Sequence, residues 1–230
     1  IYCREVNPQI RRSLFFPAGV YKVTGTINIP PFATLYGEGL DNSVILLTAG
    51  ASYAAQTADS LQQTGVNIGS GGATPPQNIT ITNLGFQTVD PEVSVFLVGQ
   101  ATNCRFQNVG FSGPMTTATL TTNANATKCV EFNTTAAYSC EQIVFDGCAF
   151  NGTVYAINTD EEVSGVIVSN STFDTLYQGV LLGTAAPSIV APTGIRITNN
   201  VFNNIYVEGI VFGSYSNLNA SAQNIFYDVG

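Results

Sequence analysis

The chain has 230 residues, of which 45% are apolar and 10% charged, with a net charge of −8 and no histidine. Its seven lysines and arginines are scattered, so they cannot form the basic surface that a nucleic-acid backbone needs, which excludes nucleic acid as a partner. The lack of histidine excludes Ser-His-Asp and Cys-His catalysis, and the lack of a CxxC pair argues against zinc. We expect no cofactor and no metal.

The first part of the chain, residues 1–77, predicts short lead-in strands and the first coil or coils of one elongated domain. Residues 14–39 contain short apolar runs punctuated by Gly and Pro residues, which is typical of strands and turns. Residues 48–77 are rich in Ala, Gly, Ser, Thr and Gln and predict a surface loop. No run of eighteen apolar residues occurs, so we expect no membrane span, and no signal peptide is recognised.

From residue 78 onward one pattern recurs: apolar, any, apolar, any, Asn or Gly, and a Phe three residues later. The period of two predicts a strand with one face inward, and the Asn or Gly predicts a left-handed bend after it. The inward pairs are Ile79/Ile81, Cys104/Phe106, Ile143/Phe145, Val166/Val168 and Ile195/Ile197, and the Phe positions are 86, 111, 150, 173 and 202. Repetition of this kind indicates units that stack on their neighbours.

A second strand follows each Phe in a common frame of its own, beginning near residues 94, 128, 155, 178 and 208. Like residues in columns, with two or more strands per unit, predict an all-β chain folded as a right-handed parallel β-helix of about six coils over residues 78–230. A loop is inserted at 112–127. A β-sandwich is the alternative, but its strands alternate in direction and would not produce such columns. We expect Ile225 and Tyr227 to begin the sixth copy and the native polypeptide to be longer.

Three short motifs near the start carry a family resemblance. Phe16-Pro-Ala-Gly-Val-Tyr21, Ile29-Pro30 and Leu35-Tyr-Gly-Glu-Gly39 resemble the opening of the pectate-lyase-like superfamily, which includes bacteriophage tailspikes, depolymerases and polygalacturonases. The resemblance implies the β-helix fold. It does not imply polygalacturonase activity, because the acids and the histidine of that family would fall on Tyr155, Tyr177, Gln178 and Glu208, and none is kept. Asn158-Thr-Asp160 copies an Asn-Thr-Asp motif of that family, but five residues out of frame.

One column of polar and aromatic residues stands at the start of the second strand on successive coils, and we call it the polar column: Ser94, Lys128, Tyr155, Gln178 and Glu208. In the similar enzymes this surface holds the sugar, so the resemblance implies that Lys128, Tyr155, Gln178 and Glu208 bind carbohydrate. The alternative is that they only solvate a turn. A glycosidase needs two carboxyls about 5 to 9.5 Å apart, and Glu208 has no such neighbour in its column. Catalytic residues are therefore not assigned.

Two further groups are weighed as sites. For a lyase, Lys128 and Tyr155 are the only neighbours in the column that fit. Residues 160–162 (Asp-Glu-Glu) with Asp174 are either a calcium or acid/base cluster or a solvated loop. The five cysteines are an odd number, which argues against a closed disulfide framework and favours burial as small apolar residues.

A second column holds the outward positions of the second strand, and three of its five residues are aliphatic: Leu97, Leu181 and Val211. We call these three the aliphatic stripe. Aligned aliphatic side chains on an outer face predict a cover, which is either a loop or another subunit. Phage tailspikes and fibres of similar fold are trimers, so the resemblance implies a homotrimer packed along this stripe.

Three functions stay open from the sequence. The first is a structural β-helix of a virion tail, of the tailspike or tail-fibre kind, that attaches to a host surface polysaccharide alongside other tail proteins. The second is a polysaccharide-degrading lyase or glycoside hydrolase, and the third is a secreted carbohydrate-binding adhesin. The location expected is the virion tail or the extracellular space.

Overall fold

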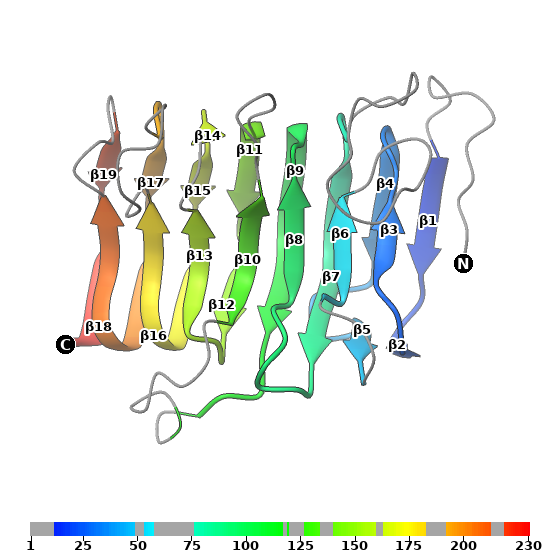
Figure 1. Cartoon of the computed structure of the whole chain (residues 1–230), viewed down its shortest axis with the longest axis horizontal. Helices are drawn as coiled ribbons and strands as arrows, with labels where there is room; N and C mark the ends of the chain where they lie inside the picture. Colours follow the sequence, from blue (N-terminus) through cyan, green and yellow to red (C-terminus); the bar gives the residue numbers. More distant parts are fainter. Residues whose placement is uncertain are drawn as a thin grey trace.

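The computed structural model describes residues 12–48, 53–57, 76–116, 119, 127–133, 140–159, 163–182, 192–212 and 219–230. Within them all named elements are strands, and every pairing between strands is parallel. The strands lie side by side along the long axis of the molecule, with each coil resting on the one before (Figure 1). The architecture is the predicted right-handed parallel β-helix.

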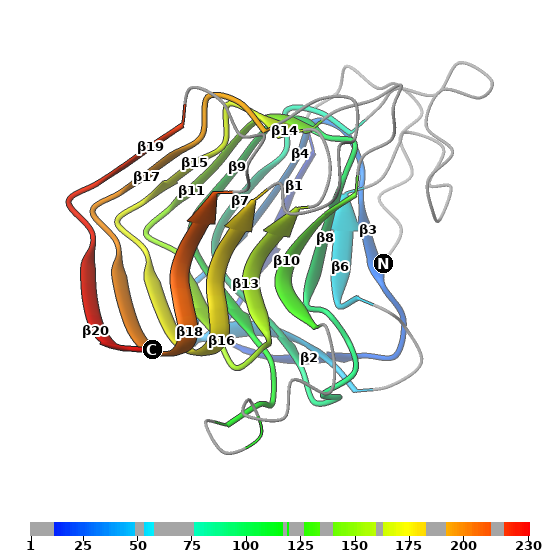
Figure 2. The ribbon, with the colours of Figure 1, turned by 60° about the vertical axis from the view of Figure 1, so that its left-hand side comes forward.

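The strands form three faces, which Figure 2 shows meeting at bends. The first sheet contains β1 (Arg12–Phe16), β4 (Ala33–Gly37), the starts of β7 (Thr80–Thr88) and β9 (Thr102–Ser112), β11 (Cys140–Asp146), β14 (Val163–Ser164), β15 (Ile167–Ser169), β17 (Arg196–Thr198) and β19 (Ala220–Ala222). The second contains β2 (Gly19–Val23), β5 (Ser43–Leu47), the ends of β7 and β9, β12 (Ala149–Asn151), the starts of β16 (Thr172–Leu182) and β18 (Val201–Phe212), and β20 (Ile225–Val229).

The third sheet contains β3 (Ile27–Ile29), β6 (Ala55–Thr57), β8 (Phe96–Gly99), β10 (Lys128–Asn133), β13 (Tyr155–Thr159) and the ends of β16 and β18. Strands from before and after residue 77 pair in the same sheets, so the lead-in already belongs to the coil. The division of the chain at residue 77 and the number of coils stay predictions.

The core is a spine of stacked phenylalanines from the second sheet. The predicted Phe positions pair in register and are at most 1% exposed, and adjacent rings along the column stack at centroid distances between 4.4 and 6.1 Å. Ile45 precedes Phe86 in this column and Phe226 follows Phe202. All the predicted inward pairs of the first strand are buried as well. The hydrophobic pattern alone therefore located the interior.

The last coil corrects one expectation. Ile225 and Tyr227 do not occupy inward positions of a first strand, because Phe226 between them pairs with Phe202 in the Phe column. The first strand of that coil is β19, in which Ser221 pairs with Ile197. A serine in an inward apolar position hid this strand from the repeat, so the predicted frame was displaced toward the C-terminus.

The predicted bends are left-handed at every position of the Asn column. Their φ angles lie between 52° and 64°, at Asn83, Asn108, Gly147, Asn170 and Asn199. The expected amide ladder is present between the first two of these asparagines, since Asn108 Nδ2 donates to Asn83 Oδ1 at 2.7 Å. Gly147 has no side chain to continue it, and Asn170 Nδ2 instead donates to Asp146 Oδ1 at 2.8 Å. Asparagine here both permits the backbone bend and links the coils.

The described cysteines are buried and free, as the odd number predicted, while Cys3 lies outside the described residues. We refer to Cys104, Cys129 and Cys148 as the buried thiols. Burial raises the pKa of each of them to about 12, because the thiolate would lose its hydration in the core. These side chains belong to the hydrophobic core and do not ionise at neutral pH.

Candidate functional site

The predicted polar column exists as a line of residues on adjacent strands. Lys128 pairs with Tyr155, Tyr155 with Gln178, and Gln178 with Glu208, from β10 through β13 and β16 to β18. Ser94 continues the line on the other side, where its Oγ accepts a hydrogen bond from the Lys128 backbone N–H at 3.1 Å. The repeat therefore placed these residues correctly relative to one another. Their role in carbohydrate binding stays a prediction.

A connected set of charged and phenolic groups occupies one end of the column. The Lys128 ammonium lies 3.0 Å from Glu131 Oε1, with side chains 17% and 25% exposed. The other carboxylate oxygen, Oε2, accepts a hydrogen bond from the Tyr53 hydroxyl at 3.1 Å. Burial raises the pKa of Tyr53 well above its ordinary value, and repulsion by the Glu131 carboxylate adds to this. Tyr53 is thus a hydrogen-bond donor here and is poorly suited to act as a base.

Tyr53 belongs to the column although the sequence did not assign it. Ala55 pairs with Phe96, which places Tyr53, two residues earlier, level with Ser94. Because Ser94 is small, the tyrosine ring reaches past it to the β10 strand and Glu131. The residues Tyr53-Ala-Ala-Gln-Thr57 do fit the frame of the second strand, but their inward residues are Ala55 and Thr57, which give no strong hydrophobic signal. A search for the frame without regard to side-chain size would have found them.

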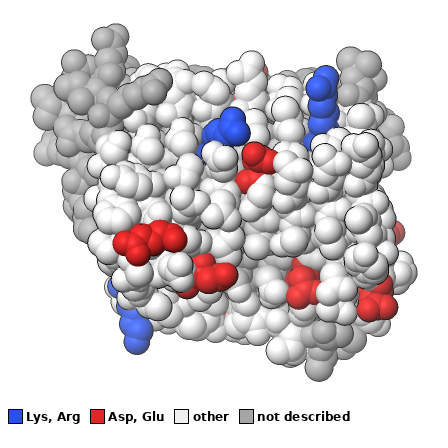
Figure 3. Space-filling model, turned by 180° about the vertical axis from the view of Figure 1, so that it is seen from behind, with Lys and Arg blue, Asp and Glu red and all other residues white. Residues whose placement is uncertain are grey.

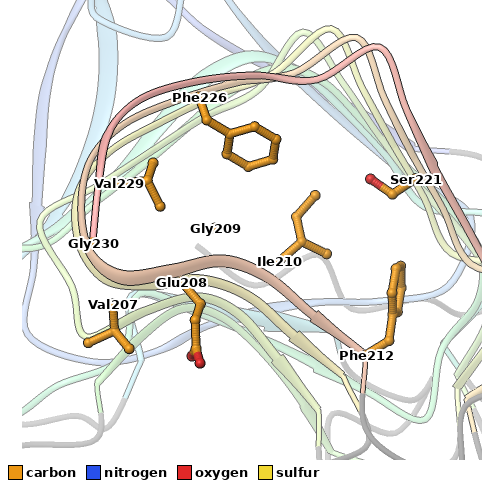
Figure 4. Close-up of a pocket in the computed structure, with 9 residues that line it drawn as sticks. All are labelled: Val207, Glu208, Gly209, Ile210, Phe212, Ser221, Phe226, Val229 and Gly230. Carbon is orange, nitrogen blue, oxygen red and sulfur yellow. The ribbon is translucent and has the colours of Figure 1, made fainter.

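The other end of the column carries an amide beside a carboxylate. Gln178 Nε2 donates a hydrogen bond to Glu208 Oε2, and the Glu208 side chain is exposed. In Figure 4 the Glu208 side chain points away from Phe226 and Ile210, on the outer side of β18. This bond uses the Gln178 amino group and one Glu208 oxygen, so the amide oxygen and the second carboxylate oxygen can accept further hydrogen bonds.

The arrangement does not provide a pair of catalytic carboxylates in the described column. Glu131 and Glu208 lie on β10 and β18, with β13 and β16 between them. Three steps of about 4.8 Å separate their strands by roughly 14 Å, which exceeds the 5 to 9.5 Å that glycosidases use. The described residues also include no cluster of three metal-ligating His, Cys, Asp or Glu side chains.

The remaining acidic candidates are partly accounted for. Residues 160–162 lie outside the described residues. The fourth member of that cluster, Asp174, accepts hydrogen bonds from three asparagine amides and one threonine hydroxyl: Asn203 at 2.8 Å, Asn204 at 2.9 Å, Asn151 at 3.3 Å and Thr175 at 3.2 Å. These contacts tie neighbouring coils together, so Asp174 serves as a structural anchor. Asn158 and Thr159 are buried in β13 and do not form an exposed motif.

The aliphatic stripe is in register, and most of its area is buried within a single chain. Leu97 pairs with Glu131, Asn158 with Leu181, and Leu181 with Val211. Leu97 is 6% and Leu181 8% exposed, whereas Val211 is half-buried. Packing of another subunit on these residues stays a prediction.

The surface is sparsely charged. Seen from behind relative to Figure 1, the molecule shows isolated acidic and basic side chains on a largely neutral face (Figure 3). Two of the described charged side chains form an ion pair, in which Arg105 Nη2 lies 3.6 Å from Asp146 Oδ2. In the described part of the chain, no helix has the length and apolar character needed to cross a membrane. Among the described residues on this face, the basic side chains are too few and too far apart to form an extended basic surface.

A hollow of about 430 Å³ lies at the end of the rod, where Figure 4 shows the interior of the last coil. Core side chains line it, among them Ile210, Phe212, Phe226 and Val229. It exposes the same apolar interior that each coil covers in its neighbour, and it contains no arrangement of polar groups that converge on a ligand.

No protein-family model and no curated protein matches the chain. Among solved structures, it is similar to a pectin methylesterase in complex with a hexasaccharide, with 12% identity and a TM-score of 0.45 over 83% of this chain and 56% of that one. It is similar to PfbA, a surface adhesin of Streptococcus pneumoniae, with 11% identity and a TM-score of 0.48 over 93% and 71%. It is similar to the ORF18 protein of Geobacillus virus E2, with 12% identity and a TM-score of 0.34 over 94% of this chain and 54% of that one. The chain spans little more than half of the esterase and of the viral protein, and none of these likenesses identifies a ligand.

Proposed function

We propose that this chain is the β-helix part of a virion tail protein, of the tailspike or tail-fibre kind, and that it attaches to a host surface polysaccharide. The observation that carries the proposal is the polar column. Its residues recur on adjacent strands about 4.8 Å apart and hold hydroxyl, ammonium, amide and carboxylate groups. A chain of sugars offers hydroxyls that donate and accept, so a row of mixed donors and acceptors suits it.

Attachment is favoured over cleavage by the state of the ionisable groups. Lys128 is held by Glu131, and Tyr53 donates to the same carboxylate. Neither group is poised to remove a proton, because the lysine is paired with Glu131 and the tyrosine has a raised pKa. The second candidate is a polysaccharide lyase, and what favours it is that Lys128 and Tyr155 are adjacent in register. The secreted adhesin shares the binding surface and differs in its setting.

The virion setting and the homotrimer rest on the aliphatic stripe. A closed three-fold assembly would cover Val211 and what is left exposed of Leu97 and Leu181. That area is small. The mass of the purified protein, measured by light scattering, tests this part separately: three chains support the assembly, and a stable single chain rejects it.

The binding part is tested with a panel of bacterial surface polysaccharides, titrated calorimetrically against the protein. Gln178→Ala removes the amide of the column, and we expect affinity to fall about fivefold to tenfold, the weight of one hydrogen bond in an exposed site. Gln107→Ala is the matched control, because Gln107 is exposed on β9 in the first sheet, and it should bind like the unmodified protein. Equal losses in both variants, or none in either, would remove the column from the proposal. New reducing ends or unsaturated sugar ends would favour the enzyme.

A further inference from the structure

A pair of stacked tyrosines lies next to the amide–carboxylate end of the polar column. The rings of Tyr177 and Tyr206 have centroids 5.6 Å apart and planes inclined by 30°. The residues before them, Leu176 and Ile205, are buried, so the tyrosines face outward where the second sheet turns into the third. Tyr206 is 47% exposed. An aromatic ring of this exposure is available to a ligand.

The tyrosines and the polar pair share the same two strands. Tyr177 is followed at once by Gln178, whereas Val207 intervenes between Tyr206 and Glu208, and the register between β16 and β18 shifts by this one residue. The bulge keeps the rings stacked while Gln178 and Glu208 remain hydrogen-bonded. The stacked tyrosine rings and the hydrogen-bond acceptors of Gln178 and Glu208 therefore lie together at one edge of the third sheet.

The charges along this face discriminate between classes of sugar. Within the strands of the third sheet that the structure describes, Lys128 is the only lysine or arginine, and its ammonium is neutralised by Glu131. Glu208 adds an exposed negative charge at the other end, and the whole chain carries −8. On these described strands a polymer of carboxylated or sulfated sugars would meet no free lysine or arginine and would be repelled.

We propose that this edge, formed by Tyr177, Gln178, Tyr206 and Glu208, is a subsite for an uncharged sugar, such as a neutral hexose or an N-acetylhexosamine, and that it rejects acidic polysaccharides. The proposal rests on the carbohydrate attachment proposed above and adds the class of ligand. The C–H face of a sugar ring packs on the exposed ring of Tyr206, since aromatic side chains combine a large apolar face with a polar tip. The hydroxyl or acetamido N–H groups at the rim of the sugar donate to Glu208 and Gln178.

The test compares uncharged and acidic probes on the full chain. Dextran, yeast mannan and chitohexaose are the uncharged probes, and polygalacturonate and hyaluronan are the acidic ones, each titrated calorimetrically at low and high salt. We expect binding to at least one uncharged probe and at least tenfold weaker binding to both acidic ones at low salt. Tighter binding of an acidic probe overturns this proposal and leaves carbohydrate attachment standing. Failure of the chain to bind any sugar, in this panel and among the bacterial surface polysaccharides, overturns both.

Two variants test the residues. Tyr206→Ala should weaken binding of the uncharged probe about tenfold, which is the weight of one aromatic contact. Tyr36→Ala is the matched control, since Tyr36 is 40% exposed and stacks on Phe15 at 5.0 Å in the first sheet. It should bind as the unmodified chain does. Both variants must first give the circular dichroism of the unmodified chain, and unchanged affinity in a folded Tyr206→Ala would overturn the subsite.

Discussion

The spine of phenylalanines makes a quantitative prediction about stability. Phe173 is fully buried, and its ring stacks on Phe150 at 4.7 Å and on Phe202 at 4.4 Å. Phe173→Ala removes the ring from between two coils that the backbone ladders hold apart, so the space cannot collapse. Large-to-small changes of this kind cost about 3–5 kcal/mol, and the loss of two stacked neighbours places this one toward the upper end.

The control is a phenylalanine in the same column with half of these contacts. Phe226 is 47% exposed and stacks only on Phe202, at 4.9 Å, among the ring contacts of the described residues. Phe226→Ala should therefore cost about 1–2 kcal/mol, since only about half of the side chain leaves water on folding. Urea unfolding followed by circular dichroism measures both. If the two variants lose the same stability, Phe173 does not occupy the interior of a stacked column and the reasoning fails.

Three further predictions concern single groups. Because the buried thiols have folded pKa values of about 12, above the 9.0 of an exposed thiol, the unfolded chain loses those protons first as the pH rises. The free energy of unfolding should therefore be unaffected by these thiols below pH 9 and fall between pH 9 and pH 12, by about 1.4 kcal/mol per thiol and pH unit. Replacing all three with alanine should make the urea midpoint less dependent on pH in this range. Glu131→Gln should lower the raised pKa of Tyr53 only in part, because burial is its larger cause, and an ultraviolet titration of tyrosine ionisation that shows no change would contradict the contact. Gly85→Ala should destabilise the fold by about 2 kcal/mol or more, because the added Cβ would strike the carbonyl oxygen of Leu40. Gly110→Ala, in the next coil, should be near neutral because the nearest atom to its added Cβ lies at 3.5 Å. Similar melting temperatures for the two variants would show that the close approach at Gly85 is absent.

The sequence predicted those parts of the fold that repeat with large apolar residues. Ile, Val and Phe at alternate positions identified the strands, because an inward position favours a large apolar side chain. The Asn column identified the bends, because a left-handed backbone favours asparagine or glycine. Two features escaped for the same physical reason. β6 and β19 place Ala55 and Ser221 at inward positions, where a small side chain suffices, so no hydrophobic period marks either strand.

The candidate site was predicted in its order and missed in its detail. A fixed frame placed Lys128, Tyr155, Gln178 and Glu208 on adjacent strands. It did not pair Tyr177 with Tyr206, because the bulge gives β18 one more residue than β16 at this corner. Spacing in sequence cannot show a contact that depends on a shift of register.

The parallel ladders that stack the coils also determine how the molecule carries load. Hydrogen bonds between strands run along the long axis, since the strands lie across it (Figure 1). Tension applied at the two ends is therefore borne by the ladders in series, and the weakest ladder opens first. A pull applied sideways, on a sugar chain lying along several strands of the third sheet, divides among those strands and is resisted in parallel. We therefore expect the coils to separate one ladder at a time under axial tension, and to resist a larger force when it is applied sideways through the third sheet.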